Sequence, residues 1–182
     1  MKKIAFMLSV AALGACNSGQ DAKVESISTT EPASAEKVTL PYDIQYSSNF
    51  EIGDQNKSKI ILDFWKDWDN GNLANGREKF ADSVHMFFAD GSVMHAGRDS
   101  VLASGQNYRN SLASAVSTVN AVVPLKSTDK NEEWVCVWGK EIDTHKDGKV
   151  DSFYLQETWR FNNAGKVDLV YQFIQKSPPP KK

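Results

Sequence analysis

The sequence predicts an α+β domain in which helices pack on one face of a curved antiparallel sheet. Three observations predict this fold class: helical apolar spacing in the first half of the domain, alternating apolar and polar residues in the second half, and turn residues between the alternating segments. Helices followed by a run of consecutive strands are typical of a sheet whose helices are gathered on one side.

The first helix is expected to begin near Asn56 or Ser58 and to end at Gly71. Its large apolar residues recur at spacings of three and four, which is the period of a helix with one buried face. These residues are Ile60, Ile61, Phe64, Trp65 and Trp68. A shorter helical piece over 74–80 and a third helix over 100–113 follow, the latter after Gly97-Arg98-Asp99.

The strands are predicted from period-two alternation between turn residues. A first pair, 84–89 and 92–95, flanks Asp90-Gly91, which is a sequence that favours a hairpin turn. The longer strands are expected over 116–125, 133–145, 150–162 and 167–175. Asp, Asn and Gly residues between these segments supply the turns of a meander.

Residues 1–15 are predicted to be a lipoprotein signal peptide. Two lysines precede a short apolar run that is too short to span a bilayer. The run ends in Leu-Gly-Ala-Cys, which resembles the lipobox of bacterial lipoproteins and implies cleavage before Cys16 and a lipid on its sulfur. An aspartate directly after the cysteine would resemble an inner-membrane retention signal. This chain has Asn17 at that position, which favours the outer membrane. An ordinary secretory peptide is the alternative.

The rest of the chain divides into a tether, a domain and a tail. Residues 16–40 are poor in large apolar residues, which predicts a disordered tether after the lipidated cysteine. Residues 41–176 form the domain, and three prolines in 177–182 indicate a disordered tail. The formal charge of the chain is -2, so no basic surface for nucleic acid is expected. With Cys16 lipidated, Cys136 is the remaining thiol and no internal disulfide is expected.

The order of elements, together with Phe80-Ala81-Asp82, Gly97-Arg98 and the hairpin sequence over 159–167, resembles the NTF2-like superfamily. That superfamily includes SnoaL-like polyketide cyclases and ketosteroid isomerases, and the resemblance covers about residues 57–176. It implies a cone: a strongly bent sheet wrapped around helices, with a pocket between sheet and helices and often a dimer formed through the sheet. The function must then be argued from the pocket, because this fold serves many chemistries.

The resemblance to ketosteroid isomerases makes three positions informative. The tyrosine that donates a hydrogen bond in those enzymes falls on Phe64, and the aspartate that acts as general base falls on Phe88. The second acid of their oxyanion site falls on Glu157. Phenylalanine can neither donate nor accept a proton, so steroid isomerisation by that mechanism is not expected.

Glu157 is the candidate catalytic residue of the sequence. Alternation places it on one face of its strand with apolar neighbours only, namely Phe153, Leu155, Trp159 and Phe161. A carboxyl group in such surroundings must be paired, protonated or open to a pocket. The functional interpretation is a single acid that points into the cone, and the alternative is a structural carboxylate with a buried partner.

Aromatic residues are expected to line the pocket, although aromatic residues at helical or strand spacing also fill cores. The expected pocket residues are Phe64, Trp65, Trp68, Phe88, Trp138, Trp159 and Phe173. His85 and His95 flank the predicted hairpin, but no metal-ligand spacing accompanies them, so no metal is expected. No phosphate-binding or dinucleotide motif appears, and no cofactor is expected.

Three functions remain open on the sequence. The first is a lipoprotein that binds a small apolar molecule in the cone. The second is a SnoaL-like enzyme of isomerase, cyclase or hydrolase type that uses Glu157 as acid or base. The third is a protein-interaction module, in which the outer face of the sheet binds a partner or a second copy of the chain.

Overall fold

The structure is a computed structural model that describes residues 39–176. The predicted signal peptide, Cys16, nearly all of the predicted tether and the predicted tail lie outside the described residues. Of the described residues, 42–176 form one compact unit. Its elements are β1 (Phe50–Ile52), α1 (Gln55–Asn70), the 3₁₀ helix η1 (Leu73–Lys79), β2 (Phe80–Phe87), β3 (Val93–Gly97), α2 (Arg98–Ser111), β4 (Leu112–Ser127), β5 (Glu133–His145), β6 (Val150–Phe161) and β7 (Val167–Lys176).

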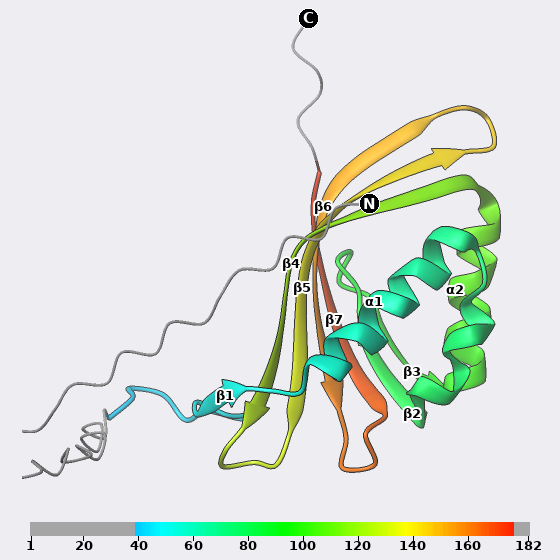
Figure 1. Ribbon diagram of the computed structural model, residues 1–182. Coiled ribbons are helices and arrows are strands. Elements are labelled where there is room, and N and C mark those ends of the chain that lie inside the picture. Colours follow the sequence, from blue (N-terminus) through cyan, green and yellow to red (C-terminus); the bar gives the residue numbers. More distant parts are fainter. Residues whose placement is uncertain (1–38, 177–182) are drawn as a thin grey trace, which may run out of the picture. The chain divides into compact units, whose positions relative to one another are not determined.

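The strands form one seven-stranded sheet in the order β1-β4-β5-β6-β7-β2-β3. Strands β4 to β7 form the predicted meander, in which each strand is antiparallel to the next. The helices lie on one face of the curved sheet, which confirms the predicted α+β class (Figure 1). One pair departs from the expected antiparallel sheet: β2 lies parallel to β7, so the sheet is mixed.

Helix α1 begins two residues earlier than the first predicted cap. The side chain of Asp54 accepts the backbone N–H of Asn56 at 2.9 Å, so Asp54 is the N-cap, while Ser58 is buried inside the helix. The predicted end is confirmed: Gly71 adopts a φ of 71°, a left-handed conformation that costs glycine little. At this end the Arg109 side chain of α2 donates from Nε to the carbonyl of Trp68 at 2.8 Å and from Nη2 to that of Asp69 at 2.9 Å.

The sheet bends where its longest strand is irregular. The pairing of β4 with β5 shifts register between Leu112 and Ser114 and again between Val119 and Ala121. An extra residue on one strand of a pair bends that strand and increases its twist. Because β4 and β5 lie beside α1, the bend brings the sheet around the helix (Figure 1).

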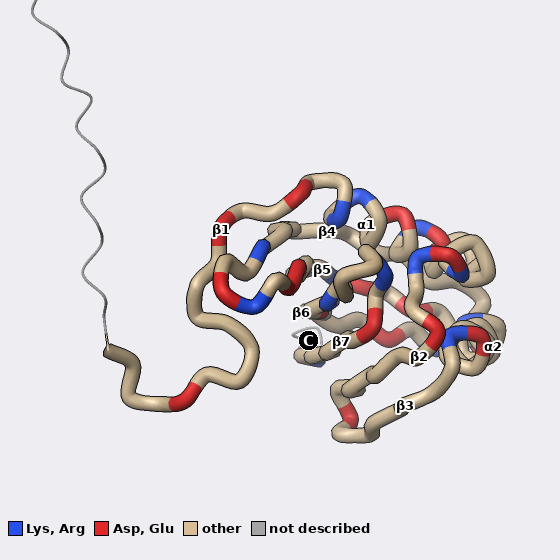
Figure 2. Tube along the Cα trace, turned by 90° about the horizontal axis from the view of Figure 1, so that it is seen from below, with Lys and Arg blue, Asp and Glu red and all other residues tan. Residues whose placement is uncertain are grey.

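The hydrophobic core lies between the helices and the inner face of the sheet, which is the face toward the helices. Its most completely buried apolar side chains are Ile61, Phe80, Val84, Val135, Val137, Phe161, Val167 and Val170. The hairpin of β2 and β3 carries a single charge between Asp82 and Arg98, which is Asp90 near its tip (Figure 2). Among the described residues, none of the helices is long and apolar enough to cross a bilayer.

Candidate functional site

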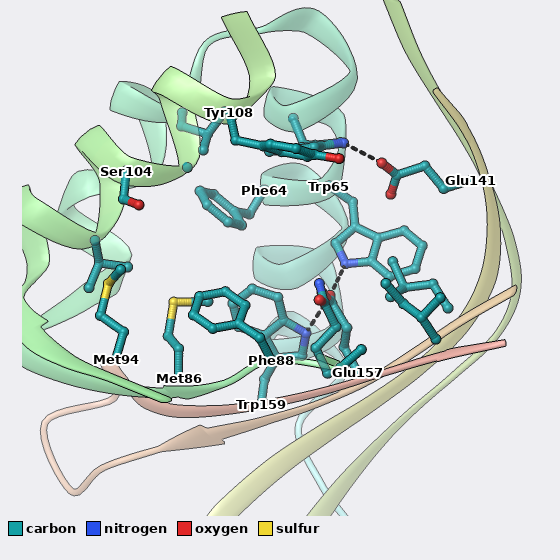
Figure 3. A pocket seen from close by; sticks show the side chains of 18 of the residues that line it. Phe64, Trp65, Met86, Phe88, Met94, Ser104, Tyr108, Glu141, Glu157 and Trp159 are labelled. Atoms are coloured by element: carbon teal, nitrogen blue, oxygen red, sulfur yellow. Dashed lines mark hydrogen bonds between the residues drawn. The ribbon is translucent and has the colours of Figure 1, made fainter. Parts of the chain in front are cut away.

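A pocket of about 600 Å³ lies between α1, α2, the β2–β3 hairpin and the inner face of the sheet. Five of the seven expected pocket aromatics line it, together with the candidate acid: Phe64, Trp65, Trp68, Phe88, Trp159 and Glu157. The two phenylalanines, which replace the tyrosine and the base aspartate of the isomerases, therefore form wall and contribute no proton-transfer group. The remaining wall includes the thioethers of Met86 and Met94 and several aliphatic side chains, together with polar residues (Figure 3).

Trp138 and Phe173 do not line this pocket. They lie on the outer face of the sheet beside a smaller surface depression, and they are 41% and 55% exposed. Val137 and Gly139 point inward, so alternation along β5 turns Trp138 outward. On β7, Gln172 reaches inward to Glu157, and its neighbour Phe173 must therefore face the other way. The expectation for these two residues was wrong because apolar residues occur on both faces of both strands.

Glu157 points into the pocket and is held by three nitrogen donors. Trp65 donates from Nε1 to Oε2 at 2.7 Å, and Trp159 donates from Nε1 to the same oxygen at 3.2 Å (Figure 3). Gln172 donates from Nε2 to Oε1 at 3.1 Å, from the position directly opposite on β7. Burial raises the pKa of Glu157, and the three donors lower it by a smaller amount.

A glycine on β5 allows the indole of Trp65 to reach Glu157. A Cβ at Gly139 would lie 2.7 Å from Cζ3 of Trp65 and 2.7 Å from the backbone oxygen of Thr118. The bare backbone of β5 therefore provides the surface on which this indole rests. The ring of Phe64, one residue earlier on α1, packs edge-on against Phe80 and Trp159 with centroids 5.0 and 5.8 Å apart.

Two further acids line the pocket, Glu141 and Asp143, and neither was expected from the sequence. They are two residues apart on the inner face of β5 and are 6% and 1% exposed. Trp68 donates from Nε1 to Oε1 of Glu141 at 2.9 Å. Within residues 39–176, Oδ1 of Asp143 is buried and has no hydrogen-bond partner. The interior therefore holds three buried acids, where a single acid was expected.

The pocket environment disfavours negative charge on Glu141 and Asp143, the pair of acids on β5. Burial and, after it, the neighbouring Asp143 raise the pKa of Glu141 to about 8, while the N–H of Trp68 acts in the opposite direction. Burial also raises the pKa of Asp143. Two adjacent carboxyl groups away from water readily share one proton, because both cannot ionise at low cost. The pair can therefore hold or release a proton near neutral pH.

The mouth of the pocket is formed by aromatic and polar side chains from α1 and α2. Trp68 stacks on Tyr108 with centroids 6.0 Å apart and planes 19° apart. Tyr108 is 55% exposed, so this stack lies at the edge between the pocket and solvent. Ser104 of α2 also lines this side (Figure 3).

The two histidines of the hairpin lie outside this chemistry. His85 and His95 are paired directly across β2 and β3, with ring centroids 3.7 Å apart, and both are exposed. Neither lines the pocket. In the described part of the chain, no group of three or more His, Cys, Asp or Glu residues is arranged to hold a metal ion.

No protein-family model and no curated protein matches this sequence. Solved structures do resemble the domain. An NTF2-like protein of unknown function from Exiguobacterium sp. 255-15 matches 65% of this chain and 99% of its own at 13% identity and a TM-score of 0.52. SalBIII, an epoxide hydrolase/cyclase-like enzyme with a role in pyran ring formation in the polyether salinomycin, matches 66% and 92% at 15% identity and a TM-score of 0.53.

A third similar structure is IdmH, a proposed polyketide cyclase from Streptomyces antibioticus. It matches 65% of this chain and 91% of its own, at 15% identity and a TM-score of 0.52. At these identities the likeness concerns the fold alone, because proteins of one fold carry out many different activities.

Proposed function

We propose, on the premise of an NTF2-like domain with an interior pocket, that the protein is a membrane-anchored extracytoplasmic lipoprotein that binds a small, largely apolar molecule. The observation that carries the proposal is the pocket of about 600 Å³, with aromatic and aliphatic walls and a few buried carboxyl groups. Small-molecule sites are typically preformed and mostly apolar, with few polar groups that fix the orientation of the ligand.

Ligand binding is tested with a variant that fills the pocket. Ser104 faces the cavity from α2, so Ser104→Trp should occupy the mouth, whereas Asn107→Trp puts the same indole on α2 at an exposed position that does not line the pocket. The native domain and the Asn107 variant are expected to bind apolar compounds from a panel by native mass spectrometry and thermal shift. The Ser104 variant should lose that binding. Equal binding by both variants would place the ligand elsewhere.

The anchor belongs to the same proposal and rests on residues 1–16. Expression of the full chain in a bacterial host should give a mature protein that begins at Cys16 and carries the mass of attached acyl chains. Cys16→Ser should abolish the acyl mass and release the domain from the membrane fraction. A mature native chain without acyl mass would contradict the anchor and leave the pocket proposal untouched.

A second candidate function is acid–base catalysis of the SnoaL-like type, on a small carbonyl or epoxide compound. It is favoured by carboxyl groups inside the pocket whose pKa values burial raises, to about 8 for Glu141, since a general acid works best with a pKa near the working pH. For any turnover found, Glu157→Gln and Glu141→Gln should each reduce kcat. Activity that survives both substitutions would exclude the carboxyl groups as catalytic residues.

Self-association through the outer face of the sheet is proposed as a further property. Trp138, Tyr154 and Phe173 are exposed there around the surface depression. Light scattering after size exclusion should give twice the chain mass for the lipid-free domain, and Trp138→Lys should shift it to a monomer. A native domain that is monomeric at high concentration would exclude this property.

A further inference from the structure

The charges around the pocket are of one sign. Its titratable lining residues are Asp90, Tyr108, Glu141, Asp143 and Glu157, and none of the 25 lining residues is Lys, Arg or His. The hairpin wall adds no basic residue either, because Asp90 is its single charge (Figure 2). A ligand with a negative charge would meet several acids and no positive partner.

Of the buried acids, Glu157 has donors on both of its oxygens, whereas the pair on β5 leaves an oxygen of Asp143 without one. Three N–H donors reach Glu157, whereas Glu141 accepts one, from Trp68. Asp143 is 1% exposed, lines the pocket, and has an oxygen without any partner among the described residues. A buried acceptor that lacks a donor costs free energy, and a donor brought by a ligand would remove that cost.

Arg109 of α2 acts on Asp143 through its charge, but its Nε and Nη2 donors are engaged elsewhere. Its Nε and Nη2 bind the last carbonyls of α1 at 2.8 and 2.9 Å. His145 is bound to Asp151, with Nε2 2.9 Å from Oδ2. Among residues 39–176, therefore, no cationic side chain donates to the free oxygen of Asp143.

Aromatic rings complete the arrangement around Glu141. Trp68 and Tyr108 stack at the pocket mouth, and the indole N–H of Trp68 binds Glu141. Tryptophan and tyrosine faces attract organic cations through their quadrupole, and this attraction grows when the cation is removed from water. A carboxyl pair beside stacked aromatic rings is a setting suited to an ammonium group.

We propose that the ligand of this pocket is an organic cation, an apolar body with one protonated amine whose ammonium binds between Glu141 and Asp143. The inference rests on the proposed ligand-binding function and names the class of ligand. The ammonium donates to the free oxygen of Asp143 and to Glu141, beneath the rings at the mouth. The apolar body extends along Phe64 and Met86 toward the hairpin.

Binding of such a cation is coupled to proton release. The empty pair holds a proton at neutral pH, because burial raises the pKa of both groups. An ammonium beside the pair favours its ionised form, so the proton leaves to solvent as the ligand binds. The groups that act on the pair are Tyr108 and Arg109 from α2, Trp68 from α1, His145 from β5, and Asp151 and Glu157 from β6.

The test compares three probes with one body: 4-phenylbutylamine, 4-phenylbutan-1-ol and 4-phenylbutyrate. In isothermal titration calorimetry on the domain at pH 7, the amine should bind most tightly, the alcohol less tightly and the carboxylate least. The amine should bind at least about tenfold tighter than the alcohol, since close buried charge pairs commonly contribute more than the 1.4 kcal/mol that a tenfold change represents. Titrations in buffers of different ionisation enthalpy should show release of about one proton per amine and none for the alcohol.

Variants identify the residues responsible. The double variant Glu141→Gln/Asp143→Asn should bind the amine and the alcohol within about threefold of each other and release no proton. Glu78→Gln is the matched control, because Glu78 is an acid whose side chain is 75% exposed and which does not line the pocket, so it should leave the preference for the amine unchanged. Thermal melting of each variant checks that it folds.

The outcomes separate the inference from the function on which it rests. If the alcohol binds as tightly as the amine, or the preference persists in the double variant, the cation inference is wrong and the apolar binding function stands. If none of the three probes binds at millimolar concentration, both are wrong.

Discussion

The buried Glu141 predicts an unusual dependence of stability on pH. Burial raises its pKa from the usual 4.5 to about 8 in the folded chain, and in the unfolded chain it should titrate near its usual value. Between these two values the folded protein keeps a proton that the unfolded chain releases. Stability therefore falls as pH rises through this window, which is the reverse of the behaviour of a salt-bridged carboxylate.

The size of the effect follows from the width of the window. For one proton, each pH unit inside the window changes the free energy of unfolding by at most about 1.4 kcal/mol. From pH 5 to pH 8, Glu141 is expected to reduce the free energy of unfolding by up to roughly 4 kcal/mol. Glu141→Gln keeps the shape of the side chain without a titrating group, so its stability should match that of the native domain near pH 5 and exceed it increasingly up to pH 8.

Urea denaturation followed by tryptophan fluorescence, at pH 5, 6, 7 and 8, measures this difference directly. Glu78→Gln removes an acid whose side chain is 75% exposed and serves as the matched control. The free energy of unfolding of this variant should change with pH as that of the native domain does. A native domain whose stability is constant or increases from pH 5 to 8, with a parallel curve for Glu141→Gln, would refute a buried, protonated acid at this position.

Substitutions at four further positions test the geometry of the site. Gly139→Ala should destabilise the domain by about 1–3 kcal/mol in urea denaturation, because its Cβ meets an indole and a backbone oxygen. Gly105→Ala should be neutral or stabilising, since its close neighbour is a flexible leucine methyl and alanine favours the helix. Glu157→Leu should cost more than Glu157→Gln in the same assay, by at least about 1–3 kcal/mol, because leucine leaves three N–H donors without an acceptor. Arg109→Met should increase amide hydrogen exchange in the last turn of α1 and leave the exchange of the central strands unchanged.

Local signals explain which parts of the fold could be predicted from the sequence. The left-handed end of α1 and the turns that contain Gly91, Gly148 and Gly165 each depend on residues within a few positions, and all four glycines adopt a positive φ. Alternation likewise placed Glu157 on the inner face, because its neighbours on that face are all apolar. The residues within or beside each of these elements are therefore sufficient to predict it.

Pairings between distant segments could not be predicted in the same way. Strand β2 pairs with the edge of β7 that β6 leaves free, although β7 follows more than eighty residues later in the chain. No local pattern indicates that the two strands run parallel. The short strand β1 pairs with the end of β4 and carries three exposed residues, so alternation gives no signal for it. Its neighbour Asp54 became the helix cap in place of the two residues proposed from the apolar period.

The missed acids show a different limit, in which the pattern was present but ambiguous. Along β5, Trp134 and Trp138 alternate with Val135 and Val137, so either face could have been the buried one. The structure buries the valine face, and the same alternation then carries Glu141 and Asp143 inward while Ile142 is 38% exposed. Trp134 is nevertheless 6% exposed, because Tyr46 and Arg160 cover it on the outer face.

The contrast between the acids changes which group is best suited to meet a ligand. Glu157 was the candidate from its sequence surroundings, yet its two oxygens already accept from Trp65, Trp159 and Gln172. A carboxyl group so held fixes the position of the indoles that form the pocket wall, and a ligand that competed for it would have to displace a donor. Asp143 has an oxygen to which no described residue donates, so no donor in this part of the chain needs to be displaced there. A ligand therefore gains more from contact with the β5 pair, and substitutions at that pair should alter ligand selectivity while substitutions at Glu157 alter stability first.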